Sequence, residues 1–279
     1  MTSVGGATQA QRGRPVGPRD RGRRLEHEPA YAAFPWWVVI IVAVLLYMGI
    51  KILVDPDYDL AWSNIAPGVW LTIRSAVIAF VIAILLGLIV GLGQISKFTV
   101  FRNLSRAYIE LIRGIPTLPL IFVVALVIVP DLSERAGQPN SVPTDLRAIL
   151  ALSILYSAYI AEIIRGGVLS VPRGQTEAGR SLGLSRRATM RSIVLPQAGR
   201  AIIPPIANDF IAILKDTSLL SVLGALEITR RSRQYSASTF KFQEAYFTLA
   251  FLYLVLVLGL SVLLRLFENW MTRDQRGAR

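Results

Sequence analysis

The sequence contains no cysteine and only one histidine, His27, which lies in a polar stretch near the start of the chain. A disulfide framework, a thiolate metal site and a catalytic thiol are therefore excluded, and zinc, haem and histidine-based catalysis lack the side chains they require. The P-loop pattern G-x-x-x-x-G-K-[ST] is also missing, so the chain has no recognisable loop for binding and hydrolysing a nucleotide. We expect a protein that is not an enzyme, binds no cofactor of its own, and depends on another protein for any energy input.

Charged residues are also scarce, because Asp, Glu, Lys and Arg make up 17% of the 279 residues while 53% are hydrophobic. The mean hydropathy of +0.51 is too high for an ordinary soluble domain of this length. A helix needs roughly 20 apolar residues to cross about 30 Å of hydrocarbon. Six stretches approach this length: residues 34–54, 70–95, 116–130, 146–166, 201–226 and 246–266. They predict an all-α integral membrane protein with six transmembrane helices, the third of which is short and is extended inward by residues 105–113.

The 30 Lys and Arg residues outnumber the 18 Asp and Glu residues and give a formal net charge of +12. They separate the apolar runs instead of gathering in one soluble segment, which argues against a nucleic-acid partner and for a topology signal. With the first residues inside the cell, 21 cations fall in inner segments and 8 in outer segments. Because short cytoplasmic loops carry the excess of Lys and Arg, we expect both termini of this membrane protein in the cytoplasm.

The two ends of the chain are predicted to be tails. Residues 1–33 are basic and rich in Gly and Pro, so they bury too little apolar surface to fold and are expected to be disordered. The first apolar run starts too late and is too long for a cleavable signal peptide. Residues 269–279 are expected to form a second, short cytoplasmic tail.

The predicted outer loop at residues 227–244 is unusual because it carries four cations, Arg230, Arg231, Arg233 and Lys241. The positive-inside tendency predicts few cations there. Two interpretations stay open at this point: translocation tolerates these charges, or the loop is a docking surface for an external partner.

The predicted inner loop at residues 170–200 has the pattern of two short helices. Thr176 is a good N-cap residue immediately before Glu177, and Gly183 can close the first helix in the left-handed conformation. Ser185 can cap a second helix, whose apolar stripe ends before Pro196. If the loop were only a surface linker, its Arg residues would suit anionic lipid headgroups.

The spacing in this loop resembles the EAA signature of permease subunits in importers of the ATP-binding-cassette (ABC) class. The matching residues are Glu177, Ala178 and Gly179, then Gly183 after three residues, Ile193 after nine more, and Leu195 and Pro196. Gly179 stands where the family usually has Ala, a change that weakens a helix by about 1 kcal/mol at most. The resemblance implies that residues 176–183 form a coupling helix, which in this family sits in a groove of a cytoplasmic ATPase.

Three further stretches resemble the histidine/glutamine permease family of polar amino-acid importers. They are YIELIRGIP at residues 108–116, AYIAEIIRGG at residues 158–167 and KDTSLLSVLG at residues 215–224. The similarity covers residues 68–268, where family members commonly have five spans. It implies the five-helix core of a type I ABC importer, preceded here by an additional transmembrane helix at residues 34–54.

The same resemblance implies partners. A dimer of cytoplasmic ATPases would hold ATP and magnesium, and a second permease subunit, identical or different, would complete the pathway. An extracytoplasmic amino-acid-binding protein would deliver the substrate. The resemblance also implies that this multi-pass protein lies in a bacterial cell (inner) membrane.

Several polar residues fall inside the apolar runs, where an ionised side chain costs roughly 2.5 to 3.5 kcal/mol at the bilayer centre. We expect these residues to face protein or water along a substrate pathway, offering donors and acceptors to a zwitterionic amino acid. The predicted pathway residues are Glu162, Asn208, Asp209, Lys215, Asp216, Thr217 and Ser218. Purely structural roles stay open, because Glu162 can pair with Arg165 on the same helix face and Lys215 and Asp216 can hold helices together.

Three acids against one base in these runs favour a cationic or neutral substrate over an anionic one. The alternative function is a proton-coupled secondary transporter that uses Glu162, since intramembrane carboxylates often relay protons. That alternative does not explain the inner-loop signature.

Overall fold

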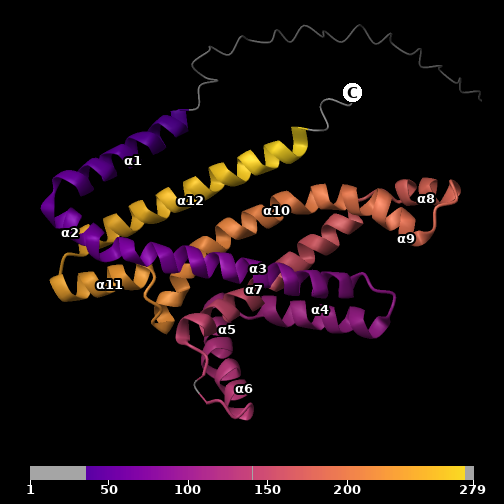
Figure 1. Cartoon of the computed structure of the whole chain (residues 1–279), viewed down its shortest axis with the longest axis horizontal. Coiled ribbons are helices and arrows are strands. Elements are labelled where there is room, and N and C mark those ends of the chain that lie inside the picture. Colours follow the sequence, from indigo (N-terminus) through magenta and orange to yellow (C-terminus); the bar gives the residue numbers. More distant parts are fainter. Residues whose placement is uncertain (1–35, 140, 274–279) are drawn as a thin grey trace, which may run out of the picture. The chain divides into compact units, whose positions relative to one another are not determined.

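The computed structural model describes residues 36–139 and 141–273, and within them every regular element is helical (Figure 1). From Ala43 onward the chain packs into one compact unit. The elements in chain order are α1 (Trp36–Val54), α2 (Pro56–Ile65), η1 (Ala66–Gly68), α3 (Val69–Gln94), α4 (Thr99–Gly114), α5 (Thr117–Phe122), η2 (Val123–Ile128), α6 (Val129–Arg135), α7 (Thr144–Leu169), α8 (Arg173–Ser181), α9 (Arg186–Thr189), η3 (Met190–Val194), α10 (Leu195–Asp216), η4 (Thr217–Leu223), α11 (Ile228–Thr239) and α12 (Phe242–Arg273). The predicted tail at residues 1–33 and residues 274–279 lie outside the described residues, whereas residues 269–273 continue α12 as helix.

Five helical segments of the described chain are long and apolar enough to cross a membrane: Trp36–Val54, Pro56–Gln94, Thr117–Arg135, Thr144–Leu169 and Phe242–Asn269. They correspond to five of the six predicted spans. The remaining one falls on α10, whose 22 residues reach about 33 Å at 1.5 Å per residue. Its Arg200, Asp209, Lys215 and Asp216 make it less apolar than the other five. A sixth span therefore stays a prediction.

The contact between α3 and α7 forms the centre of the core. The buried face of α3 presents small residues at intervals of three or four, among them Ala79, Ala83, Gly87 and Gly91. A Cβ atom on Gly87 would lie 2.7 Å from Cγ2 of Ile160, so the two backbones approach as closely as they do only because glycine stands there. Small residues at such a contact allow two helices to pack tightly in a membrane. α7 is accordingly the most enclosed apolar helix, with 67% of its apolar window buried.

The predicted inward extension of the third span over residues 105–113 is wrong, because these residues belong to a separate helix, α4. Ile115 leaves the helical conformation (ψ 132°) before Pro116, and a new helix begins at Thr117. The reason is steric, since a residue that precedes proline is disfavoured in the α region. α4 packs against α3 and α7 and buries Ile109 and Ile112.

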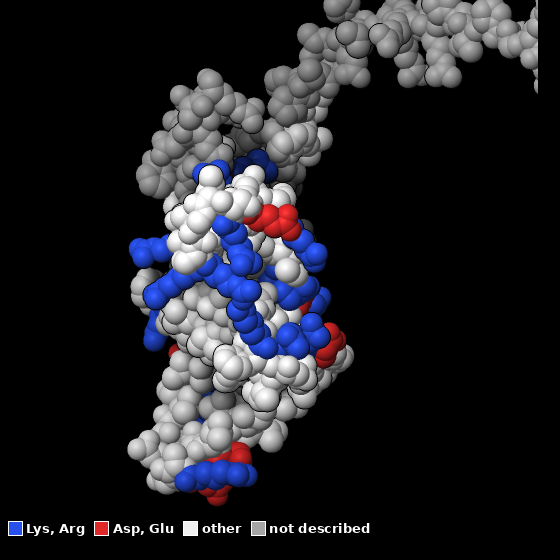
Figure 2. All heavy atoms as spheres, turned by 90° about the vertical axis from the view of Figure 1, so that its right-hand side faces the viewer, with Lys and Arg blue, Asp and Glu red and all other residues white. Residues whose placement is uncertain are grey.

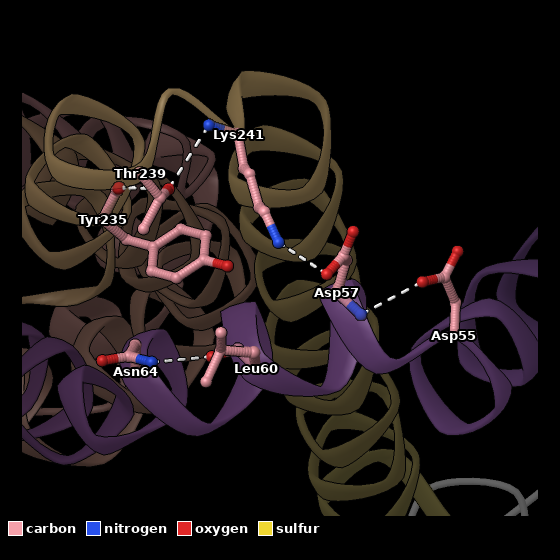
Figure 3. A network of polar contacts seen from close by, with 7 residues as sticks. All are labelled: Asp55, Asp57, Leu60, Asn64, Tyr235, Thr239 and Lys241. Atoms are coloured by element: carbon pink, nitrogen blue, oxygen red, sulfur yellow. Dashed lines mark hydrogen bonds and ion pairs between the residues drawn. The ribbon is translucent and has the colours of Figure 1, made fainter.

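The predicted outer loop contains the helix α11, which packs against α2 and α12. Figure 3 shows Lys241, between α11 and α12, reaching to Asp57 of α2, with 2.5 Å between Nζ and Oδ1. The hydrogen bond from Lys241 to Asp57 raises the pKa of the lysine above its usual value. Arg231 Nη1 donates to the carbonyl oxygen of Asn64 at 3.2 Å. Two of the four cations in this loop are therefore held by α2, and docking of an external partner on the loop stays a prediction.

Glu227 begins α11 as a fully buried N-cap. Its two carboxylate oxygens accept hydrogen bonds from the backbone N–H groups of Arg230 (2.7 Å) and Thr229 (2.8 Å), and the Tyr253 hydroxyl donates to it at 3.2 Å. Burial nevertheless raises the pKa of Glu227, because desolvation of the charged form outweighs these bonds.

Candidate functional site

The first helix of the predicted coupling loop, α8, begins at Arg173, four residues earlier than an N-cap at Thr176 predicts. Thr176 therefore lies inside the helix and the prediction that it is the N-cap is wrong; Pro172 occupies the cap position and gives no side-chain hydrogen bond. The reason is that proline, whose fixed φ suits the start of a helix, competes successfully with the weaker signal of Thr176.

The end of α8 is as predicted. Gly183 has a φ of +83°, which only glycine adopts cheaply. The Gly183 N–H donates to the carbonyl of Arg180 at 3.0 Å, and the Leu184 N–H donates to the carbonyl of Gly179 at 3.1 Å. These two bonds make a Schellman motif, which satisfies the last carbonyls of the helix.

The second short helix begins as predicted but does not end before Pro196. Ser185 Oγ accepts from the Ala188 N–H at 3.2 Å and caps α9. The helix then widens into one π-turn, η3, and continues into α10. Pro196 has no N–H to donate and its ring crowds the preceding turn, so a wider turn directly before it lets the helix run on. The apolar stripe thus leads into a long helix.

The signature residues divide between exposed and buried positions. Glu177, Ala178, Gly183, Leu195 and Pro196 are exposed, and Thr176 is partly exposed. Gly179 is buried, and a Cβ atom there would lie 2.5 Å from Cδ1 of Ile193. The terminal methyl group of Ile193 would have to move to admit an alanine at this position, and its closeness shows that η3 lies against α8 at that point.

A polar hollow of about 410 Å³ lies where α3, α4 and α7 meet, and it contains Glu162. Arg165 donates to both carboxylate oxygens of Glu162, with Nη2 2.7 Å from Oε2 and Nε 3.3 Å from each oxygen. Gln94 Nε2 donates to Oε1 at 2.9 Å. The structural pairing considered for Glu162 and Arg165 is present, and the same pair lines a hollow open to solvent. The lining residues are Gln94, Arg106, Ile109, Glu110, Arg113, Glu162 and Arg165.

The other predicted pathway residues do not line this hollow. Lys215 and Ser218 line a second cavity of about 440 Å³ beside Tyr253 on α12. Asp216 accepts from the Tyr156 hydroxyl at 2.9 Å, which ties α10 to α7.

Three further residues of that set lie apart from both cavities. Thr217 is buried, with its hydroxyl donating to the Leu214 carbonyl at 2.8 Å, and Asn208 is exposed. Asp209 is partly buried, and its Oδ2 atom has no hydrogen-bond partner among the described residues.

Four lining residues of the polar hollow, Gln94, Arg106, Glu110 and Arg113, were not among the predicted pathway residues. A signal for three of them was present, because Arg106, Glu110 and Arg113 recur at the helical spacing of four and three residues on one face of α4. A search for charged residues inside apolar runs does not find these three residues, because α4 is not itself an apolar run. Arg113 also lies over the Tyr159 ring of α7, with Cζ 5.3 Å from the ring centroid.

Comparison with known proteins gives consistent matches. Residues 83–273 match the family model described as binding-protein-dependent transport system inner membrane component. The probable amino-acid permease protein YxeN of Bacillus subtilis is 37% identical over 206 residues, covering 74% of this chain and 90% of that protein. The glutamine transport system permease protein GlnP of Escherichia coli is 34% identical over 217 residues, covering 75% and 97%. Among solved structures, an amino acid ABC transporter with histidines matches with a TM-score of 0.67 and 34% identity, covering 74% of this chain and 94% of that one.

Proposed function

Because the chain belongs to the family of binding-protein-dependent transport system inner membrane components, and is the permease subunit of an amino-acid ABC importer, we propose that it carries polar amino acids through the hollow around Glu162. It is a multi-pass membrane component and not an enzyme. Hydrolysis of ATP, with its magnesium, belongs to a separate cytoplasmic ATPase dimer, and both termini of the chain lie on that side.

The single observation that carries the substrate assignment is the composition of the polar hollow. It is lined by three Arg and two Glu side chains. Glu162 is already neutralised by Arg165, which leaves Arg106 and Arg113 to meet a carboxylate and Glu110 to meet an ammonium group. A free amino acid carries both groups, and charge-assisted bonds to each would hold it. The count of three acids against one base favoured a cationic or neutral substrate over an anionic one, but Asp209 and Asp216 do not line this hollow with Glu162, so the composition of the hollow is used here in place of that count.

Coupling to the ATPase is proposed for α8 and the residues around it. The exposed Glu177 and Ala178 lie on a short helix whose end is fixed by Gly183. A rigid, capped helix can transmit a push or a pull from a partner better than a loop, and exposed residues are free to enter a partner's groove. Leu195 and Pro196 mark the point where this segment continues into α10, so a movement of α8 would pass to the proposed pathway helices.

The rest of the assembly follows from the same proposal. A second permease subunit would face the first across the pathway, and an extracytoplasmic amino-acid-binding protein would deliver substrate at the end that carries α11.

No observation favours the proton-coupled alternative. Both Glu162 oxygens are engaged by Arg165, an arrangement expected of a fixed ion pair and not of a carboxylate that must take up and release protons.

The test is substrate uptake by the reconstituted importer carrying Arg106→Gln and Arg113→Gln together. We expect the KM for the amino acid to rise about tenfold or more, since each hydrogen bond to a charged group contributes about 1.5 to 3 kcal/mol. Arg102→Gln is the matched control on the same helix, because Arg102 points to Ser96 and Thr99 and does not line the hollow. An unchanged KM in the double variant, with normal assembly, would remove the hollow from the pathway.

A further inference from the structure

The predicted cytoplasmic end of the molecule contains a cavity of about 760 Å³ that the proposed transport mechanism does not use. It is enclosed by the end of α7, by α8 and α9, and by the turn between α3 and α4, and we call it the basic cavity. Its charged lining consists of five cations, Lys97, Arg173, Arg180, Arg186 and Arg187, and its apolar lining consists of Val168, Leu169, Val171, Met190 and Val194.

None of the lining residues is a carboxylate, and none of the five cations forms an ion pair with a carboxylate of the described chain. Figure 2 views the side that carries α8 and α9, where blue Lys and Arg side chains gather and red Asp and Glu side chains are few. Five cations brought together without counter-charges repel one another, so an anion that entered the cavity would be bound strongly.

The rest of the lining limits which anion fits. A free inorganic anion would gain nothing from the apolar side chains, two of which, Leu169 (63% exposed) and Met190 (40% exposed), present their surface to solvent. The residue after Lys97, Phe98, is 70% exposed, and Val100, two residues further on, is 75% exposed. These side chains would be covered by lipid in a membrane, so the mouth of the cavity lies at the depth of the headgroups on the inner side.

We propose that the basic cavity binds the phosphate headgroup of an anionic phospholipid from the inner leaflet, with part of an acyl chain over Leu169 and Met190. The bound lipid would neutralise the cations behind α8 and hold α8 against the end of α7. The five cations provide the affinity, at about fivefold for each Lys or Arg near an anionic surface.

The geometry of α8 favours a lipid over an acidic surface of the ATPase as the occupant. Arg173, Thr176 and Arg180 line the cavity and, at about 100° per residue, lie on one side of the helix. Gly174, Ala178 and Ser181 are exposed on the opposite side. A partner that receives α8 through that exposed side would leave the cavity behind the helix unfilled.

The experiment measures phospholipid that stays bound to the complete importer after purification, by native mass spectrometry. The complex is reconstituted in mixed phosphatidylglycerol and phosphatidylcholine and then extracted. We expect retained phosphatidylglycerol in the wild type and a fall of about 25-fold in affinity for the Arg186→Gln, Arg187→Gln double variant, which is two contributions of about fivefold each. Arg191→Gln with Arg265→Gln is the matched control, because both residues are exposed and neither lines the cavity.

Two further arms separate the possible occupants. A wash with excess inorganic phosphate should leave the retained lipid in place; displacement of the lipid would show a site for free phosphate, with no use for the apolar lining. The amount of ATPase that co-purifies with each variant is measured in the same spectra. If the double variant lost the ATPase and kept its phosphatidylglycerol, the cavity would be an ATPase contact and the proposal would be wrong. Equal retention of phosphatidylglycerol and phosphatidylcholine by the wild type would also overturn it.

Discussion

Gly183 offers a test of whether the fixed end of α8 matters for coupling. Substitution by alanine places a Cβ atom on a residue with a φ of +83°, which costs about 1 to 2 kcal/mol in an L-residue. Beyond the local backbone, no atom of the described chain lies within 4 Å of that Cβ position, so the cost comes from the local backbone conformation and not from packing against another element. A loss of 1 kcal/mol is about a fivefold shift in equilibrium, so the Schellman hydrogen bonds of Gly183 and Leu184 should open about fivefold or more as often.

The assay has two readouts on the assembled importer. Hydrogen exchange at the Leu184 amide should speed up by about that factor, and stimulation of the ATPase by the loaded binding protein should fall. Gly183→Asn should lie between alanine and wild type, because asparagine tolerates the left-handed conformation better. Gly174→Ala is the control within the same helix, since that glycine also has open space around it and an ordinary φ. If Gly183→Ala and Gly174→Ala gave the same exchange rate and the same stimulation, the reasoning would be refuted.

Three other substitutions test separate parts of the account. Gly87→Val should prevent assembly or cost about 1 to 3 kcal/mol, because its side chain would meet Ile160 at the α3–α7 contact; normal thermal stability in detergent would show that this contact is loose. Asp209→Asn should raise thermal stability and leave selectivity unchanged, because it removes a charge whose buried Oδ2 atom has no hydrogen-bond partner in the described part of the chain; a shift of uptake away from cationic substrates would show that Asp209 belongs to the pathway. Burial raises the pKa of Glu227, so its contribution to stability is complete below its ordinary pKa of about 4.3 and is lost as the pH rises through the raised value. In this pH range, the melting temperature of Glu227→Gln should therefore fall less steeply with rising pH than that of the wild type. An identical slope in both proteins would contradict the raised pKa of Glu227.

The sequence predicted most of the helices because their physical signals are local. Long apolar runs predict α1, α3, α7 and α12, and the left-handed preference of glycine predicts the end of α8 at Gly183. The N-cap prediction is wrong because a second start signal, Pro172, lies four residues before Thr176 and the fixed φ of proline prevails there. Pro116 was a sequence signal for the helix break at Ile115. The predicted third span nevertheless continued across this break, because the residues after Pro116 form an uncharged run.

The candidate site was predicted only in part because its residues meet through tertiary packing. Glu162 and Arg165 share a helix face, so their pairing follows from sequence spacing. Gln94 joins them from α3, 68 residues away, and nothing local relates those positions. Asp209 and Lys215 were grouped with Glu162 because each is an ionisable residue inside an apolar run, and that property does not specify which side of a helix faces a hollow.

ATP-dependent uptake without a proton gradient would distinguish an ATP-driven importer from a proton-coupled transporter. The permease is reconstituted with its ATPase and binding protein in liposomes that enclose ATP, and entry of a labelled polar amino acid is followed with and without a protonophore. We expect that uptake requires ATP, continues when the proton gradient is collapsed, and is lost with Glu177→Lys on the exposed surface of α8. Uptake that stops with the protonophore and proceeds without ATP would contradict this expectation.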